Sequence, residues 1–110
     1  MQVLRQTVIA LLLIVATNAA AQDLQTQIEE CEACHGPGGV STEDDIPSIS
    51  GMDAAELTNS LEEFYFYERH CTTTTYRHGD RPKTPLNMCN IANVLSEEDR
   101  IALGEYFAAQ

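Results

Sequence analysis

The pentapeptide 31–35, Cys-Glu-Ala-Cys-His, constrains this chain more than any other stretch. A CxxCH run is the attachment signature of c-type haem. In such a site both thiols bond to the porphyrin and the histidine coordinates the iron. Cysteines three positions apart lie on one side of a helical turn, so one cofactor can reach both. The pattern predicts one covalently attached haem c, bonded to Cys31 and Cys34 and coordinated by His35.

A CxxC pair also occurs in redox dithiols and in halves of zinc sites. The dithiol interpretation needs a βαβ setting, and this sequence has no such pattern. A zinc site needs a second Cys/His pair at short spacing, and Cys71 and Cys89 are too far apart to form one. Haem attachment is therefore the favoured interpretation.

Residues 1–21 have the features of a secretory signal peptide. Arg5 supplies a positive start, residues 8–16 are apolar, and three alanines at 19–21 form a small-residue cleavage site. An uncleaved anchor is the alternative, but the apolar run is short for a membrane span. We expect export to the periplasm, cleavage before Gln22, no membrane anchor afterwards, and a single domain over residues 22–110.

The composition is strongly acidic, with 17 Asp and Glu against six Lys and Arg, a formal net charge of −11. Such a field disfavours nucleic acid and anionic membranes, and it steers the chain toward a partner with a basic surface. The alternative is that the acidity only keeps a small exported protein soluble.

The spacing of apolar residues predicts helices and no strands. A first short helix is expected over 23–31 with Asp23 as its cap, and the glycines at 36–39 end it. A second is expected from Asp53 to about Tyr67, with Glu56 completing a capping-box-like start.

Between His70 and Leu86 no periodicity is visible, which predicts a long irregular connection. A short helix is expected around residues 91–95, and a final one, capped by Ser96 and Asp99, to about Ala108. Gly104 inside that last helix indicates close approach to another helix. The prediction is an all-α fold of three to five short helices around the haem.

Met88 is the favoured second axial ligand, because it follows the irregular connection and because His/Met ligation is usual in cytochromes c. A methionine there also raises the reduction potential. Met52, at a helix start, is expected to pack in the core, and His70 and His78 lie in polar, loop-like sequence.

Cys71 and Cys89 remain as an even pair in an exported protein, which favours a disulfide. Such a bond contributes about 3 kcal/mol, and it would fix the segment that carries Met88. The alternative is a copper site built from His70, Cys71, His78 and Cys89.

These residues together resemble a class I c-type cytochrome over nearly all of 22–110. The resemblance rests on the CxxCH motif, Pro47 with Gly51, Met88, and the closing segment 95–107. It implies crossing terminal helices and a Pro47 carbonyl that accepts the ring N–H of the axial histidine, an arrangement that fixes the ring.

The stretch 71–89 is similar to the small cytochrome subunits of flavocytochrome c sulfide dehydrogenases. That resemblance implies a non-catalytic, electron-carrying haem subunit in sulfur oxidation, beside a flavoprotein partner. The alternative function is a haem enzyme or gas sensor with an open sixth iron position. A dithiol oxidoreductase is disfavoured by His35.

Overall fold

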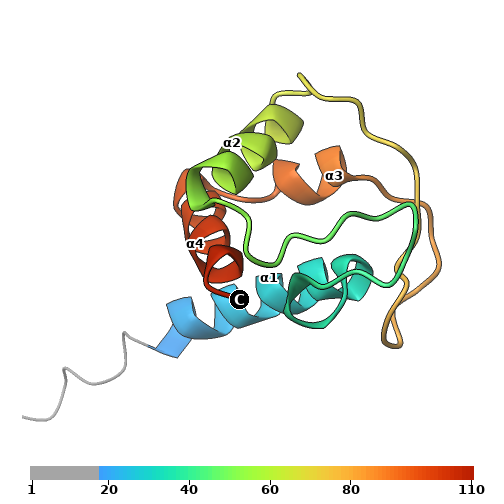
Figure 1. The fold of residues 1–110 in the computed structure, drawn as a ribbon, viewed down its shortest axis with the longest axis horizontal. Coiled ribbons are helices and arrows are strands. Elements are labelled where there is room, and N and C mark those ends of the chain that lie inside the picture. Colours follow the sequence, from blue (N-terminus) through green and yellow to red (C-terminus); the bar gives the residue numbers. More distant parts are fainter. Residues whose placement is uncertain (1–17) are drawn as a thin grey trace, which may run out of the picture.

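In the computed structural model, residues 18–110 are described, with side chains from Asp23 onward (Figure 1). They form four α-helices and one 3-10 turn, and contain no strand beyond an isolated bridge between Thr74 and Leu86. The predicted all-α fold is confirmed. The elements are α1 (Asn18–His35), η1 (Pro37–Gly39), α2 (Ala54–Tyr65), α3 (Met88–Asn93) and α4 (Glu97–Ala108).

Helix α1 is longer than predicted at both ends. It begins at Asn18, so Asp23 lies inside the helix and is not its cap; its carboxylate instead accepts a bond from Gln27 Nε2 at 3.4 Å. The helix then continues through the whole CxxCH motif and ends at His35, directly before Gly36. The apolar part of the predicted signal peptide, residues 8–16, lies outside the described residues.

Helix α2 begins as predicted and ends earlier than predicted. The Asp53 carboxylate accepts the Glu56 N–H at 3.1 Å, which caps the start. The helix ends at Tyr65, not near Tyr67, because Tyr67 takes a left-handed backbone conformation with φ 56°.

Helices α3 and α4 carry well-formed caps. Asn87 caps α3, whose first residue is Met88, three positions before the predicted start of that short helix. Ser96 Oγ accepts the Asp99 N–H at 3.1 Å while the Asp99 carboxylate accepts the Ser96 N–H at 2.9 Å. This reciprocal pair is the capping box predicted for α4.

The core lies where α1, α2, α3 and α4 converge. Helix α2 packs against α3 and α4, and α1 packs against α4, so the terminal helices meet. Gly104 permits the α2–α4 approach, because a Cβ there would lie 2.8 Å from the Ala54 carbonyl oxygen. The buried apolar residues of the cluster are Ile28, Ile49, Leu57, Leu61, Leu95, Leu103 and Phe107.

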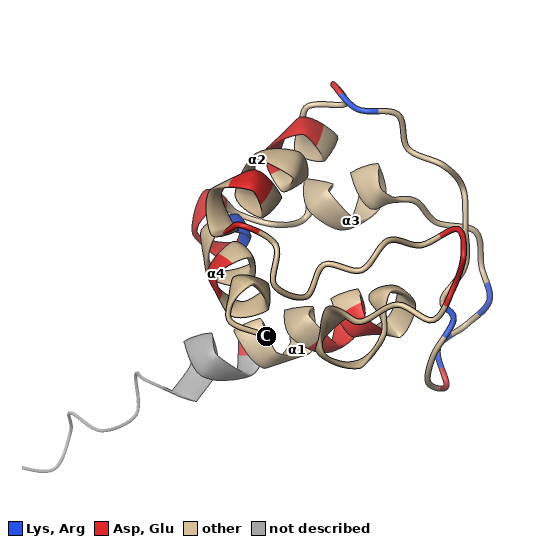
Figure 2. Ribbon diagram, viewed as in Figure 1, with Lys and Arg blue, Asp and Glu red and all other residues tan. Residues whose placement is uncertain are grey.

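The connection from Phe66 to Asn87 is irregular, as predicted, and arches around the open side of the helices (Figure 1). It carries most of the described basic residues, whereas most of the acidic ones lie on α1, α2, α4 and the 43–45 loop (Figure 2). Within residues 18–110, no helix has the length and apolarity that crossing a membrane requires.

Candidate functional site

One large cavity of about 430 Å³ lies between the helices and the long connection. Its volume falls in the range of small-molecule and cofactor sites. Every α-helix contributes to its walls, as do the 45–49 loop and the 69–76 segment. The apolar side chains that line it are Ile46, Ile49, Met52, Leu57, Leu61, Phe64, Leu86, Met88, Ile91, Leu103 and Phe107.

His35 lies in the wall of this cavity with only 8% of its surface exposed. Its Nδ1 is 2.7 Å from the carbonyl oxygen of Pro47, which can only accept, so Nδ1 carries the proton and donates it. Burial lowers the pKa of the imidazole, although the bond to Pro47 opposes this shift. The ring is therefore neutral at pH 7, with Nε2 free to coordinate a metal.

The two cysteines of the motif are unpaired thiols that line the same cavity. Burial, reinforced by the nearby Glu30 and Glu32 carboxylates, raises the pKa of Cys31 to about 12. Burial also raises the pKa of Cys34. Because the thiolate is the reactive form, both thiols are less reactive in this folded chain than an ordinary cysteine is.

Three of the four candidates for the predicted second iron ligand line the cavity. Met88, Met52 and His70 all line the cavity, whereas His78 does not. Met88 is the first residue of α3 and is half-buried, while His70 is exposed. Met52 packs against the apolar cluster. The choice of Met88 as iron ligand stays a prediction.

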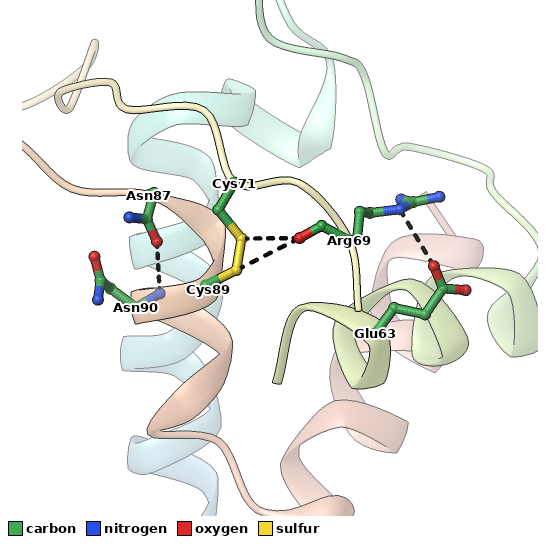
Figure 3. Close-up of a disulfide and its surroundings, with 6 residues drawn as sticks. All are labelled: Glu63, Arg69, Cys71, Asn87, Cys89 and Asn90. Atoms are coloured by element: carbon green, nitrogen blue, oxygen red, sulfur yellow. Dashed lines mark hydrogen bonds and ion pairs between the residues drawn. A yellow bond between two sulfur atoms is a disulfide. The ribbon is translucent and has the colours of Figure 1, made fainter. Parts of the chain in front are cut away.

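Cys71 and Cys89 form a disulfide, with their Cα atoms 5.8 Å apart (Figure 3). Cys89 is 2% exposed and follows Met88 directly, so the bond fixes the first turn of α3 to the long connection. Both sulfur atoms are used in this bond, so the structure favours the disulfide over the alternative copper site. In addition, no group of three or more His, Cys, Asp or Glu residues that could hold a metal occurs in the described part of the chain.

A short strap, residues 75–78, lies across the CxxCH segment and was not predicted from sequence. The Ala33 carbonyl accepts the backbone N–H groups of both Arg77 and His78 at 2.8 Å. The Tyr76 hydroxyl, which lines the cavity, donates to the Glu30 carboxylate at 3.0 Å. An isolated aromatic residue in a polar run was the one local signal of this contact.

Arg77 ties the strap to the loop that carries Pro47. Its guanidinium donates to both carboxylate oxygens of Asp45, at 3.0 and 2.7 Å, and to Glu43 at 3.3 Å. Paired donation of this kind fixes geometry more firmly than a single contact. The wall that contains the thiols is thus joined to the wall that supports the His35 ring.

This set of residues fits the cofactor that the motif predicts. The cavity is lined mainly by apolar side chains, as a porphyrin requires, and the two thiols and a neutral imidazole project from one helix into it. A thioether sulfur, Met88, is available from a different element in the same lining.

Comparison with known proteins points to electron transfer. No family model matches the chain. The chain is 32% identical over 85 residues to a protein of Stutzerimonas stutzeri (strain A1501) named "Thiosulfate dehydrogenase electron acceptor". The match covers 76% of this chain and 34% of that relative, so the chain spans about a third of the relative's length. A relative that accepts electrons from a dehydrogenase is consistent with an electron-transfer protein that carries a redox cofactor.

Proposed function

We propose that this chain is a one-electron carrier, a monohaem c-type cytochrome of class I, whose working domain spans residues 22–110 after export to the periplasm. The observation that carries the proposal is that Cys31, Cys34, His35 and Met88 all line the same cavity of about 430 Å³. Haem c would supply reversible one-electron chemistry at this place.

Each residue has a distinct role in the proposal. Cys31 and Cys34 hold the porphyrin covalently, and His35 Nε2 and Met88 Sδ coordinate iron. Pro47 keeps the imidazole oriented through its carbonyl, a contact that also raises ligand basicity. The Cys71–Cys89 bond restrains the segment that carries Met88, which limits rearrangement between oxidation states.

The electron donor is proposed to be an enzyme that oxidises an inorganic sulfur compound. The name of the Stutzerimonas relative supports a thiosulfate dehydrogenase, and the resemblance of residues 71–89 supports a sulfide-oxidising flavoprotein. Copurification from the native periplasm separates the two donors. A yellow flavoprotein that travels with this chain would identify it as a flavocytochrome subunit.

The second candidate function, a haem enzyme or gas sensor, requires an iron position without a protein ligand. Met88 and Met52 both line the cavity, so a sulfur donor is at hand and the carrier is favoured. Carbon monoxide that binds readily to the untreated reduced protein would support the alternative.

An optical spectrum of the matured protein tests the proposal. Reduced protein should show c-type bands, and its mass should exceed that of the polypeptide by one haem. Oxidised protein should show a weak long-wavelength sulfur-to-iron band that Met88→Ala abolishes and Met52→Ala, the matched control, retains. Loss of the band in Met52→Ala alone would assign the ligand to Met52, and colourless protein would refute the proposal.

A further inference from the structure

We propose that Phe66 and Tyr67, the aromatic corner at the end of α2, form the docking contact for a redox partner protein with a basic surface around an apolar centre. The inference rests on the proposed function and names the surface through which it operates.

The first argument is the backbone at the corner. Helix α2 ends in a Schellman motif, in which Glu68 N–H bonds to the Glu63 carbonyl at 2.8 Å and Tyr67 N–H to the Phe64 carbonyl at 3.1 Å. The left-handed position of that motif is usually glycine, yet here Tyr67 occupies it with φ 56°. Bulky residues rarely adopt this conformation, so a glycine at position 67 would make the folded chain more stable than tyrosine does.

The second argument is exposure. Tyr67 is 64% exposed and Phe66 is 56% exposed. The Phe66 ring keeps an edge contact with the Tyr65 ring at 5.0 Å. The Tyr67 side chain, whose backbone is the strained one, gains little from packing inside this chain. Large exposed aromatic side chains are typical of protein interfaces, where they act as anchors in the buried centre. A strained position that keeps an exposed tyrosine is accordingly explained by a contact outside the chain.

The third argument is position. Phe64 and Arg69 both line the cavity, and the Arg69 guanidinium lies 5.4 Å from the centre of the Phe64 ring. The corner projects from the turn between these two residues. Next along the chain, exposed residues also line the cavity, namely His70, Thr72 and Thr73. A protein seated on the corner would therefore lie beside an exposed stretch of the cavity wall.

The fourth argument is charge. Glu62 and Glu68 are exposed on either side of the corner. The only cation in the turn, Arg69, is paired with Glu63 at 3.4 Å (Figure 3). The local field is thus negative, as is the net charge of −11. A basic partner is attracted to such a surface, while a second copy of this chain is repelled.

The experiment uses the matured holoprotein and a lysine-rich cytochrome c of mitochondrial type as the basic probe. Calorimetry at low ionic strength gives the Kd, and urea unfolding gives the stability. Tyr67→Gly should raise the stability and weaken binding about tenfold, and Phe66→Ser should weaken binding similarly. Val94→Ser, the control, removes an apolar side chain that is 78% exposed elsewhere and should leave the Kd unchanged.

A charge pair of variants checks the acidic rim. Glu62→Gln with Glu68→Gln should weaken binding several-fold at low salt, and the difference should vanish at high salt. Glu97→Gln with Glu98→Gln makes the same change in net charge on α4 and should have a much smaller effect. Equal effects of the two double variants would overturn the assignment of the surface.

The outcomes separate this inference from the proposed function. A c-type spectrum with a Kd that no corner variant changes overturns the docking contact alone. Colourless protein whose binding still depends on the corner refutes the carrier and supports the contact. A dimer in sedimentation that Tyr67→Gly dissociates would show a second copy at the corner and overturn the assignment to a basic partner.

Discussion

At Gly104 the backbone of α4 approaches α2 so closely that a single methyl group has no room. An added Cβ would lie 2.4 Å from Thr58 Oγ1 and 2.8 Å from the Ala54 carbonyl oxygen. The hydroxyl could rotate away, but the carbonyl belongs to the first turn of α2. A glycine inside a helix lowers the stability of that helix relative to alanine. Its presence at position 104 therefore predicted a close approach of two helices, and the structure confirms this approach.

Gly104→Ala is expected to destabilise the protein by about 1–2 kcal/mol, because the overpacking cost exceeds the gain in helix propensity. Urea unfolding measures the difference. Glu105→Ala, at the next position and exposed, should stay within about 0.5 kcal/mol of the parent. A Gly104→Ala protein that is more stable than the parent would contradict the close contact.

The roles of two other residues could not be predicted from sequence, because each has a partner that is distant in the chain. Arg100 is buried, donates to the Leu95 carbonyl at 2.9 Å, and lies 4.5 Å over the Tyr65 ring. Arg77 pairs with Asp45, more than 30 positions earlier. No local pattern marks either residue, since both would also suit an exposed polar position.

Among the helices, α4 has the clearest local sequence pattern that marks where a helix begins. Ser96 and Asp99 satisfy each other's backbone N–H groups, and three acidic residues fill the first turn, where the helix dipole favours them. Such signals are local, so the beginnings of α2 and α4 were predictable. Where α1 begins and α2 ends is decided by weaker signals: Asp23 suits a cap and also an exposed helical position, and Tyr67 looks like one more apolar residue.

The capping box predicts a pH dependence. The Ser96 N–H, which bonds to the carboxylate, lowers the pKa of Asp99 below its ordinary 3.8. The folded state thus binds this proton less readily than the unfolded chain does. The stabilisation is fully present above about pH 5 and is lost as the pH falls through 3.8 and below. Asp99→Asn should lose less stability than the parent between pH 5 and pH 3.

Urea unfolding at the two pH values provides the measurement. Glu98→Gln removes a neighbouring carboxylate that is not part of the box and should retain the pH dependence of the parent. If the stability of Asp99→Asn fell as steeply as that of the parent, the carboxylate would have no part in the acid sensitivity.

For the molecule as a whole, the excess of acidic residues predicts electrostatic repulsion among the carboxylates of the folded chain. Seventeen acidic residues against six Lys and Arg repel one another more strongly in the compact state than in the unfolded chain. The total follows from the sequence, and the fold shows how it is distributed: most of the described cations lie on the 66–87 connection, and most of the carboxylates lie on α1, α2, α4 and the 43–45 loop (Figure 2).

Added salt should therefore stabilise the protein at pH 7. Raising NaCl from about 10 mM to 200 mM shortens the screening length severalfold, and the Tm is expected to rise by about 2–5 °C. Near pH 4.4, the calculated isoelectric point, the same addition should change the Tm little. A fall in Tm with salt at pH 7 would mean that attractive ion pairs outweigh the repulsion.

Two cross-links, one nested within the other, join the beginning of the 66–87 connection to residues near its end. The Cys71–Cys89 bond forms the outer closure, and the Thr74–Leu86 bridge, with N···O distances of 2.8 and 2.9 Å, forms the inner one. The tip of the loop between Thr74 and Leu86, at Gly79 and Asp80, is exposed, and nothing lies within 4 Å of a Cβ built on Gly79. The disulfide and the bridge hold the base of the loop, and the strap that bonds to Ala33 ends at His78, so extra length inserted at 79–80 need not displace any of these contacts. The tip is thus a natural place to graft an affinity tag or an electrode tether.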